Sequence, residues 1–238
     1  MRPRFIPTWA ALALLVMVAG AWVQSTDATA SQSIATLKRQ ADSGDAKAQF
    51  QLGRDYVRGD GVPQDFVQAS LWYRKAADQG LAEAQSSLGG AYRLGLGLPK
   101  DDAQAAFWLR KAANQGDGLS QLLLGTSYDH GDGVPRDYTQ AVVWYRKAAE
   151  QGITIAQRCL GSSYAQGEGV PQDYAEAYFW LDLAASGKLE YSEHGDAAKL
   201  GDVSKLRDDT ASHLTSTVLL QTQERARKWF EDHPANPQ

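Results

Sequence analysis

The chain has 238 residues, of which 43% are hydrophobic and 22% are charged. This composition is that of an ordinary globular protein with length for one or two domains, and it argues against a disordered chain. The formal net charge of -4 and the pI near 5.6 argue against nucleic acid or an anionic lipid surface as the main partner, because phosphate binding depends on a basic surface.

The first thirty residues predict a secretory signal peptide. Arg2 and Arg4 precede an apolar run over 9–23, and residues 28–30 form a small-x-small cleavage pattern before Ser31. The alternative is an uncleaved anchor, although this run is shorter than the roughly 20 residues that span the hydrocarbon core. We therefore expect a periplasmic or secreted protein, with no membrane span once residues 1–30 are removed.

A 36-residue period organises the rest of the chain. A fixed period of about 20 to 50 residues indicates a stacked array in which each unit is one supersecondary element. Six residue types recur in register: Gly44, Gly80, Gly116 and Gly152; Leu52, Leu88, Leu124 and Leu160; Tyr56, Tyr92, Tyr128 and Tyr164; Pro63, Pro99, Pro135 and Pro171; Asp65, Asp101, Asp137 and Asp173; and Trp72, Trp108, Trp144 and Trp180.

The spacing inside one unit predicts an antiparallel helical hairpin. Ala48, Leu52 and Tyr56 recur every four residues, which places them on one stripe of a helix over about 45–58. The glycines and the proline of 59–63 force a turn, and Asp65 then stands where the N-cap of a second helix belongs.

The repeated tryptophans are predicted to pack between neighbouring hairpins. Trp72 shares helical spacing with Ala69, Ala76 and Ala77, so the Trp ring supplies bulk and the alanines supply the gap that receives it. The alternative, an aromatic platform for a sugar or a base, conflicts with this placement among small apolar residues. We expect the tryptophans to be core residues.

These motifs resemble the Sel1-like repeat, a relative of the tetratricopeptide repeat. The pattern Ala-x3-Leu-Gly-x2-Tyr, Gly-x-Gly-Val-Pro-x-Asp, Ala-x2-Trp and Ala-Ala-x2-Gly occurs in four copies, over 44–79, 80–115, 116–151 and 152–187. The departures are Ser120 for Ala, Leu98 for Val and a fourth copy one residue short at Gly187. The resemblance implies an all-α, right-handed α/α solenoid of the exported bacterial type, without a cofactor.

Capping segments are expected on both sides of the repeats. Residues 31–43 are expected to form an N-terminal capping helix, in which 34–43 resemble the latter half of a second helix and should cover the first hairpin. Residues 188–238 should contain capping helices at about 203–213 and 217–232, followed by a tail. Solenoids need such polar-faced ends.

If the repeated residues form the core, function is expected where the repeats differ. Positions 47, 50, 54 and 58 lie opposite the buried stripe of the first helix, which lines the inner curve in related solenoids. We predict that this concave face binds a protein or peptide segment of unknown identity, and not nucleic acid. The candidate binding residues are Lys47, Phe50, Arg54, Arg58, Leu94, Leu122, Thr126, His130, Arg158 and Gln166.

One alternative for this surface stays open. The apolar side chains at its later positions, Leu119, Leu122 and Ile155, would on this alternative pack against the next hairpin and would not meet a partner. Single exposed apolar residues need no functional explanation.

The sequence does not favour an enzyme. The four His, at 130, 194, 213 and 233, lack the spacing of a zinc site, so no metal is expected, and neither a nucleophile elbow nor a phosphate-binding loop occurs. Ser127, Asp129 and His130 stand within one helical turn and so point in different directions. Cys159 is the only Cys, which excludes an intramolecular disulfide and favours a small apolar filler.

Two functions remain. The first is a non-catalytic scaffold for protein or peptide binding. The second is a cell-wall or glycan-associated factor, including a weak hydrolase, which would need two carboxylates about 5 to 9.5 Å apart in one cleft. The acidic residues at Asp65 and its equivalents are expected to be helix caps instead.

Overall fold

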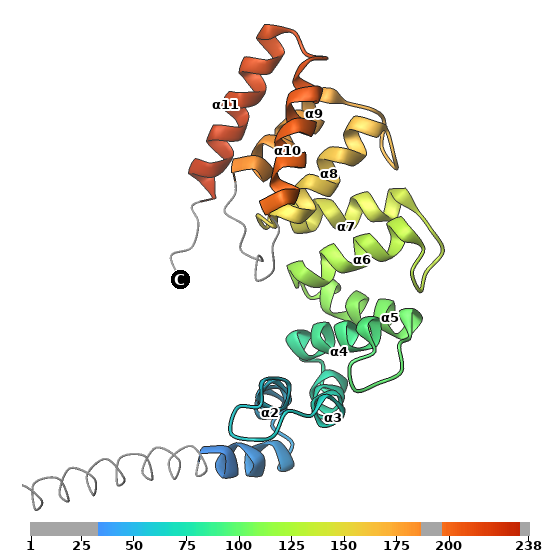
Figure 1. Ribbon diagram of the computed structural model, residues 1–238, viewed down its shortest axis with the longest axis vertical. Helices are drawn as coiled ribbons and strands as arrows, with labels where there is room; N and C mark the ends of the chain where they lie inside the picture. The colour runs from blue at the N-terminus through green and yellow to red at the C-terminus, as the bar shows by residue number, and fades with distance from the viewer. Residues whose placement is uncertain (1–32, 187–196, 234–238) are drawn as a thin grey trace, which may run out of the picture. The chain divides into compact units, whose positions relative to one another are not determined.

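The computed structural model describes residues 33–186 and 197–233, and every regular element in these two ranges is a helix (Figure 1). The predicted signal peptide, the stretch from Lys188 to 196 and the last five residues lie outside the described residues. The chain forms two compact units, Met1–Leu81 and Ala82–Gln238.

The first unit contains a short helix followed in the chain by one hairpin. The hairpin consists of α2 (Ala46–Arg58) and α3 (Phe66–Asp78), and the preceding helix covers residues 33–42. Ala41 of that helix joins Leu52 and Trp72 in one buried cluster. This helix lies within the segment 31–43 predicted to cap the first hairpin.

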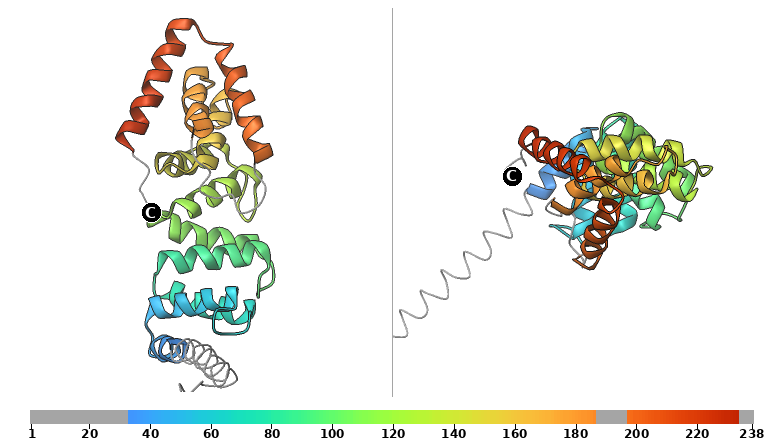
Figure 2. Two further views of the ribbon diagram at one scale, coloured as in Figure 1. Left: turned by 60° about the vertical axis from the view of Figure 1, so that its left-hand side comes forward. Right: turned by 90° about the horizontal axis from the view of Figure 1, so that it is seen from above.

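The second unit contains three hairpins and two further helices. From α4 to α9 each helix packs against the next one in the chain, so the three hairpins follow one another in a stack (Figures 1 and 2). The helices are α4 (Ala82–Leu94), α5 (Asp102–Asn114), α6 (Gly118–His130), α7 (Tyr138–Glu150), α8 (Thr154–Gln166), α9 (Tyr174–Ser186), α10 (Ala197–Ala211) and α11 (Ser216–Asp232). We call α2, α4, α6 and α8 the first helices of their hairpins, and α3, α5, α7 and α9 the second helices.

The predicted helix caps are confirmed. The carboxylates of Asp65, Asp101 and Asp137 accept hydrogen bonds from backbone N–H groups at the starts of α3, α5 and α7. Asp173 accepts from Ala175 and Glu176 in the same way. Each of these carboxylates satisfies donors that a helix start leaves unpaired.

The two glycines of the Gly-x-Gly-Val-Pro turn have different structural roles. Gly131 ends α6 in the left-handed region, with φ 80°, which a residue with a side chain rarely adopts. Gly133 passes so close to the preceding hairpin that an added Cβ would lie 1.9 Å from the carbonyl oxygen of Asp102. The turn of one hairpin thus rests on the start of the previous second helix.

The repeated tryptophans and leucines form the core, as predicted. Trp108, Trp144 and Trp180 are 3%, 7% and 5% exposed, and the repeated Leu124 and Leu160 are fully buried. In the first helix of each hairpin a glycine allows the partner helix to approach. A Cβ on Gly53, for example, would lie 2.7 Å from the Tyr73 ring.

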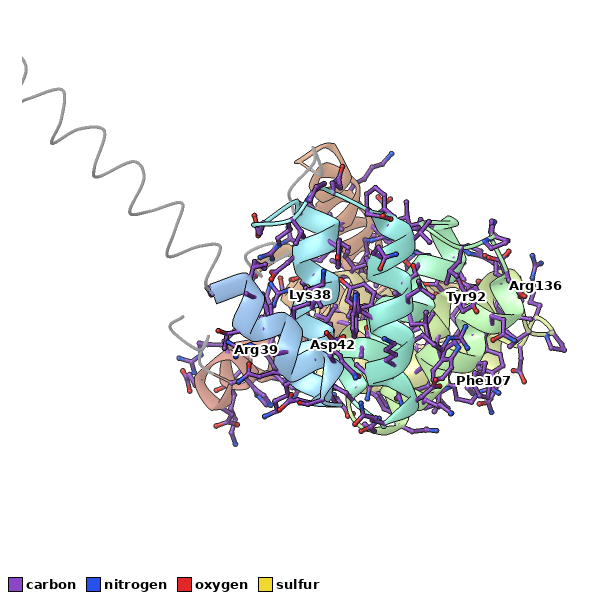
Figure 3. The ribbon with its side chains drawn as sticks, turned by 90° about the horizontal axis from the view of Figure 1, so that it is seen from below. Lys38, Arg39, Asp42, Tyr92, Phe107 and Arg136 are labelled. Carbon is purple, nitrogen blue, oxygen red and sulfur yellow. The ribbon has the colours of Figure 1, made fainter. Side chains whose placement is uncertain are left out.

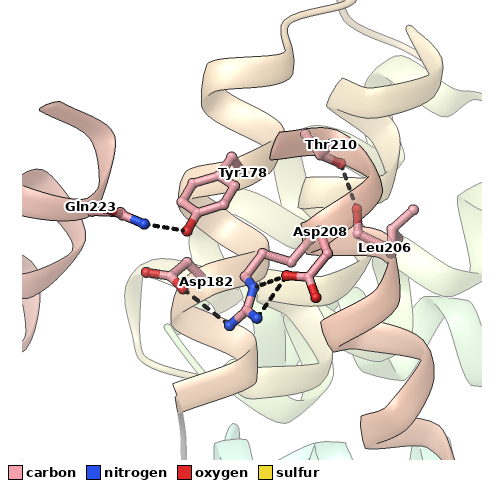
Figure 4. A network of polar contacts seen from close by, with 7 residues as sticks. Tyr178, Asp182, Leu206, Asp208, Thr210 and Gln223 are labelled. Atoms are coloured by element: carbon pink, nitrogen blue, oxygen red, sulfur yellow. Dashed lines mark hydrogen bonds and ion pairs between the residues drawn. The ribbon is translucent and has the colours of Figure 1, made fainter. Parts of the chain in front are cut away.

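Two C-terminal helices cover α9, where a cap was predicted. α10 begins at Ala197, earlier than the predicted 203, and α11 agrees with the predicted 217–232 to one residue. Arg207 of α10 pairs with Asp182 of α9 at 3.5 Å, and Gln223 of α11 donates to the Tyr178 hydroxyl (Figure 4). Figure 2 shows the two helices diverging from the turn that joins them.

The position covered by α11 is exposed in the other hairpins. Leu71, Phe107 and Val143 are 50%, 46% and 42% exposed, whereas Phe179, at the same step of the repeat, is 2% exposed. The guanidinium of Arg225 lies 3.9 Å from the Phe179 ring centre. The fourth hairpin is therefore adapted to receive a helix on its second-helix face.

Candidate binding surface on the first helices

Four of the predicted binding residues lie on α2. Lys47 and Arg58 are exposed, whereas Phe50 and Arg54 are partly buried. The Phe50 ring lies 5.7 Å from the Tyr73 ring, centre to centre, and the Arg54 guanidinium lies 5.9 Å from the Phe50 ring centre. The aromatic pair supports the arginine side chain, so this part of the surface combines an apolar platform with positive charge.

The predicted residues of the second unit form a more neutral surface. Leu94 is 63% exposed at the end of α4, and Gln166 is exposed at the end of α8. His130 lies 3.9 Å from the Asp132 carboxylate, and both side chains are mostly in solvent. Thr126 is partly buried and its hydroxyl donates to the Leu122 carbonyl, while Arg158 is also partly buried.

Leu122 belongs to the core, which corrects its assignment to the binding surface. Its side chain is 6% exposed and lies in a buried cluster with Ala156 and Leu160 of α8. The cause is visible one hairpin earlier, where the Ser120 hydroxyl of α6 donates to the Ser86 hydroxyl of α4. In α4 and α6 this position faces the next first helix, so the alternative of packing against the next hairpin holds for Leu122.

A ladder of glutamines connects the helices and was not predicted from the sequence. Gln151 donates to the Gln121 side chain at 2.8 Å, and Gln121 donates to the Ala113 carbonyl of the preceding second helix. Gln79 and Gln49 make the same pair in the first unit. The sequence contained a signal for this ladder, because a glutamine recurs at the 36-residue step as Gln49, Gln85, Gln121 and Gln157.

The residues that resemble a catalytic triad do not form one. Ser127 is buried and its hydroxyl donates to the Leu123 carbonyl, whereas His130 pairs with Asp132. The carboxylate of Asp129 accepts a hydrogen bond from the Tyr145 hydroxyl at 3.0 Å. Each group is committed to a different partner, so no proton relay connects them.

Cys159 is not an activated nucleophile. Burial is the largest effect and raises the pKa of its thiol; the nearby Arg158 opposes this rise, the Asp129 carboxylate adds to it, and a hydrogen bond with Tyr145 opposes it weakly. A reactive cysteine needs the opposite, a lowered pKa and access to solvent. The thiol instead fills space beside the buried cluster around Leu160.

An open pocket of about 550 Å³ lies between helix 33–42 and α2. Asp55 stands at its buried side, is 7% exposed and accepts a hydrogen bond from Gln51 at 2.8 Å. Burial raises the pKa of the Asp55 carboxyl group. The pocket is lined by Ser33, Ile34, Thr36, Leu37, Gln40, Gln51 and Asp55, which are separate from the predicted binding residues.

The described residues offer neither a metal site nor a membrane span. Across 33–186 and 197–233, no group of three or more His, Cys, Asp or Glu side chains is arranged to hold a metal ion. Within the part of the chain that the structure describes, no helix has both the length and the apolar character needed to cross a membrane.

Comparison with known families decides the classification. The Sel1 repeat profile matches four consecutive segments, 46–81, 82–117, 118–153 and 154–188, which together cover more than half of the chain. The chain belongs to the Sel1 repeat family. Each matched segment begins two residues after the start of the corresponding predicted unit.

Two solved Sel1 repeat structures resemble this one. A Sel1 repeat protein from Oxalobacter formigenes is 38% identical, with a TM-score of 0.61 over 73% of this chain and 49% of that chain. A protective antigen of uropathogenic Escherichia coli strains is 29% identical, with a TM-score of 0.54 over 84% of this chain and 49% of that chain. The present Sel1 repeat chain thus spans about half the length of either structure.

A curated relative has a described binding activity. The secretory immunoglobulin A-binding protein EsiB of Escherichia coli O6:H1 is 42% identical over 64 residues, which are 26% of this chain and 13% of EsiB. The likeness therefore covers a short stretch of either chain.

Proposed function

We propose that this chain is an exported, non-catalytic scaffold that binds a protein or peptide segment along its first helices. One observation carries the proposal: the repeated leucine, tryptophan and alanine positions are buried and identical from hairpin to hairpin, whereas exposed positions of the first helices differ. Arg58, Leu94, His130 and Gln166 occupy one such position, and all four are exposed. Variation at an exposed position above a repeated core is suited to recognition of a particular partner.

Two further facts support binding in preference to catalysis. EsiB, which is 42% identical to this chain over 64 residues, binds secretory immunoglobulin A. The repeated aspartates Asp65, Asp101 and Asp137 serve as helix caps at the starts of the second helices. A glycan-hydrolysing role has no comparable support.

Site-specific photo-crosslinking tests the surface. A photoreactive residue is placed at Arg58, Leu94 or His130 on the first helices, and at Val67 on α3, which is 53% exposed, as the matched control. Crosslinking in the native envelope should yield one defined adduct from the first-helix positions and none from Val67. Adducts only from Val67, or from no position, would overturn the proposal.

Export forms a separate part of the proposal and rests on residues 1–30. The basic start, the apolar run and the small-x-small site support cleavage before Ser31. Mass spectrometry of the protein from an envelope fraction should find Ser31 at the N-terminus. An intact Met1 would support a retained anchor instead.

A further inference from the structure

The positive charge of the first helices is concentrated on one stripe of α2. With about 100° of rotation per residue, Lys47, Arg54 and Arg58 lie within an arc of about 40°, and Phe50 adjoins them. This stripe is opposite the arc of Leu52, which is fully buried. The stripe is cationic on a chain whose formal net charge is -4, so it is a local feature and does not reflect overall composition.

The three cations make no ion pair within the described ranges of the chain. Other surface cations do, such as Arg225 with Glu176 and Arg207 with Asp182. Arg54 and Arg58 are close enough to Asp55 to oppose the rise of its pKa, but that carboxylate faces the pocket and accepts from Gln51. The charges on the stripe are therefore available to an external anion.

The stripe is a property of the first hairpin and not of the repeat. The residues equivalent to Lys47 are Glu83, Leu119 and Ile155, and those equivalent to Arg54 are Gly90, Thr126 and Ser162. The repeat does not need these cations for its core, because the other three hairpins fold without them. Three cations on one exposed face of one helix thus require an explanation other than packing.

The spacing along α2 fits an extended peptide. Phe50, Arg54 and Arg58 follow one another at four-residue steps, which are about 6 Å each along a helix. Alternate side chains of an extended strand lie on one face at about 6.6 Å. A strand laid along α2 therefore presents successive same-face side chains to Phe50, Arg54 and Arg58 in turn.

We propose that this α2 stripe binds an extended acidic segment of a protein partner, with two carboxylates two residues apart and an apolar side chain two residues beyond them. The inference rests on the proposed function and names the chemistry of its ligand. Arginine guanidinium groups donate paired hydrogen bonds to carboxylates, and the Phe50 ring receives the apolar side chain. Lys47, nearly one turn before Phe50, adds a further positive charge at the same end.

A defined peptide tests the inference while the natural partner is still unidentified. The probe is the blocked heptapeptide Phe-Ser-Glu-Ser-Glu-Ser-Phe, which offers the same pattern in both chain directions, and the control peptide has Gln in place of both Glu. Amide shifts of the ¹⁵N-labelled protein are followed by NMR. The acidic peptide should shift residues of α2 and bind at least about fivefold more tightly than the Gln peptide. The difference should shrink in 0.5 M salt, a concentration at which screening is strong (Debye length on the order of 4 Å).

Two matched variants connect the effect to the stripe. Arg54→Gln combined with Arg58→Gln should remove the preference for the acidic peptide. Lys38→Gln combined with Arg39→Gln removes the same charge from the exposed side of helix 33–42, where Figure 3 shows both side chains, and should leave the preference intact. Circular dichroism confirms that both variants stay helical.

Each outcome is decisive for this inference. Equal binding of the two peptides, no shifts in α2, or a preference that survives the Arg54 and Arg58 changes would overturn it. Such a result would leave the proposed function standing if the crosslinks from Leu94 and His130 persist. Loss of crosslinks from every first-helix position would instead remove the proposed function itself.

Discussion

The ammonium group of Lys147 lies 4.1 Å from the ring centre of Trp144, on the same helix. The same pairing joins Lys75 to Trp72 at 3.7 Å and Lys111 to Trp108 at 4.6 Å. The lysine side chain covers a tryptophan ring that is otherwise buried. A cation over an aromatic face also adds a modest attraction. Each of the first three hairpins thus covers its own tryptophan.

Replacement of a repeated tryptophan should destabilise the stack more than any change at an exposed position. Trp144 packs against Ala106, Leu109 and Leu124, so Trp144→Ala removes contacts between two hairpins. We expect a loss of about 3 to 5 kcal/mol in the free energy of unfolding, measured by urea denaturation. The adjacent Val143→Ala, at a position 42% exposed, is the control and should cost under about 1 kcal/mol. Equal losses would contradict the core assignment.

Hairpins, caps and core were predictable because the information for them is local. A four-residue spacing of Ala48, Leu52 and Tyr56 defines one face of a helix, and an aspartate after a Pro turn defines the start of the next. The 36-residue period then repeats the same local pattern in four units. The fold class therefore followed from the sequence alone.

The open surface was predicted less well, because it depends on how hairpins rotate against one another. A helical wheel places Phe50 and Leu122 equally far from the buried stripe, yet Phe50 is partly exposed and Leu122 is buried against α8. A helical wheel describes an isolated helix and takes no account of the helices packed against it. The glutamine ladder was missed for a related reason, since a period alone does not distinguish residues that pack from residues that hydrogen-bond.

The fourth hairpin differs from the others where lysine is replaced by Leu183. Leu183 is fully buried in the cluster that also contains Ala226 and packs Trp229 of α11. Leu183→Lys restores the residue of the other hairpins and places a charge in this apolar contact, so α11 should detach at a cost of at least about 2 kcal/mol. Hydrogen exchange of the α11 amides measures the release. Leu220→Lys on the exposed side of α11 should leave exchange unchanged, and the same protection in both variants would refute this account.

Asp55 should make the first unit less stable at neutral pH than an uncharged side chain would. Burial raises the pKa of its carboxyl group, so the folded state favours the protonated acid. The stability that the protonated carboxyl group contributes is complete below the pKa of Asp in the unfolded state, about 3.9. It is lost as the pH rises through the raised pKa of the folded state. Asp55→Asn should therefore stabilise the protein at pH 7, with an advantage that shrinks towards pH 4.

Thermal unfolding at several pH values tests the Asp55 prediction. Asp42→Asn, at an exposed position of helix 33–42, removes the same formal charge and serves as the control. The control should show no comparable gain at pH 7. A pH-independent difference for Asp55→Asn would mean that packing, and not ionisation, causes the effect.

Cys159 should react slowly with thiol reagents in the folded protein. Only the thiolate reacts, and burial both raises the pKa of this thiol and restricts access to it. At pH 8, labelling by a chromogenic disulfide should be at least about tenfold slower than in urea, where a thiol has its ordinary pKa of about 8.5. The control is Cys159→Ser combined with Ser212→Cys, which moves the single thiol to an exposed position and should react at the rate of the unfolded chain. Rapid labelling of folded Cys159 would show that the contact around Tyr145 and Asp129 opens readily, and the packing between the third and fourth hairpins would then be looser than its buried side chains indicate.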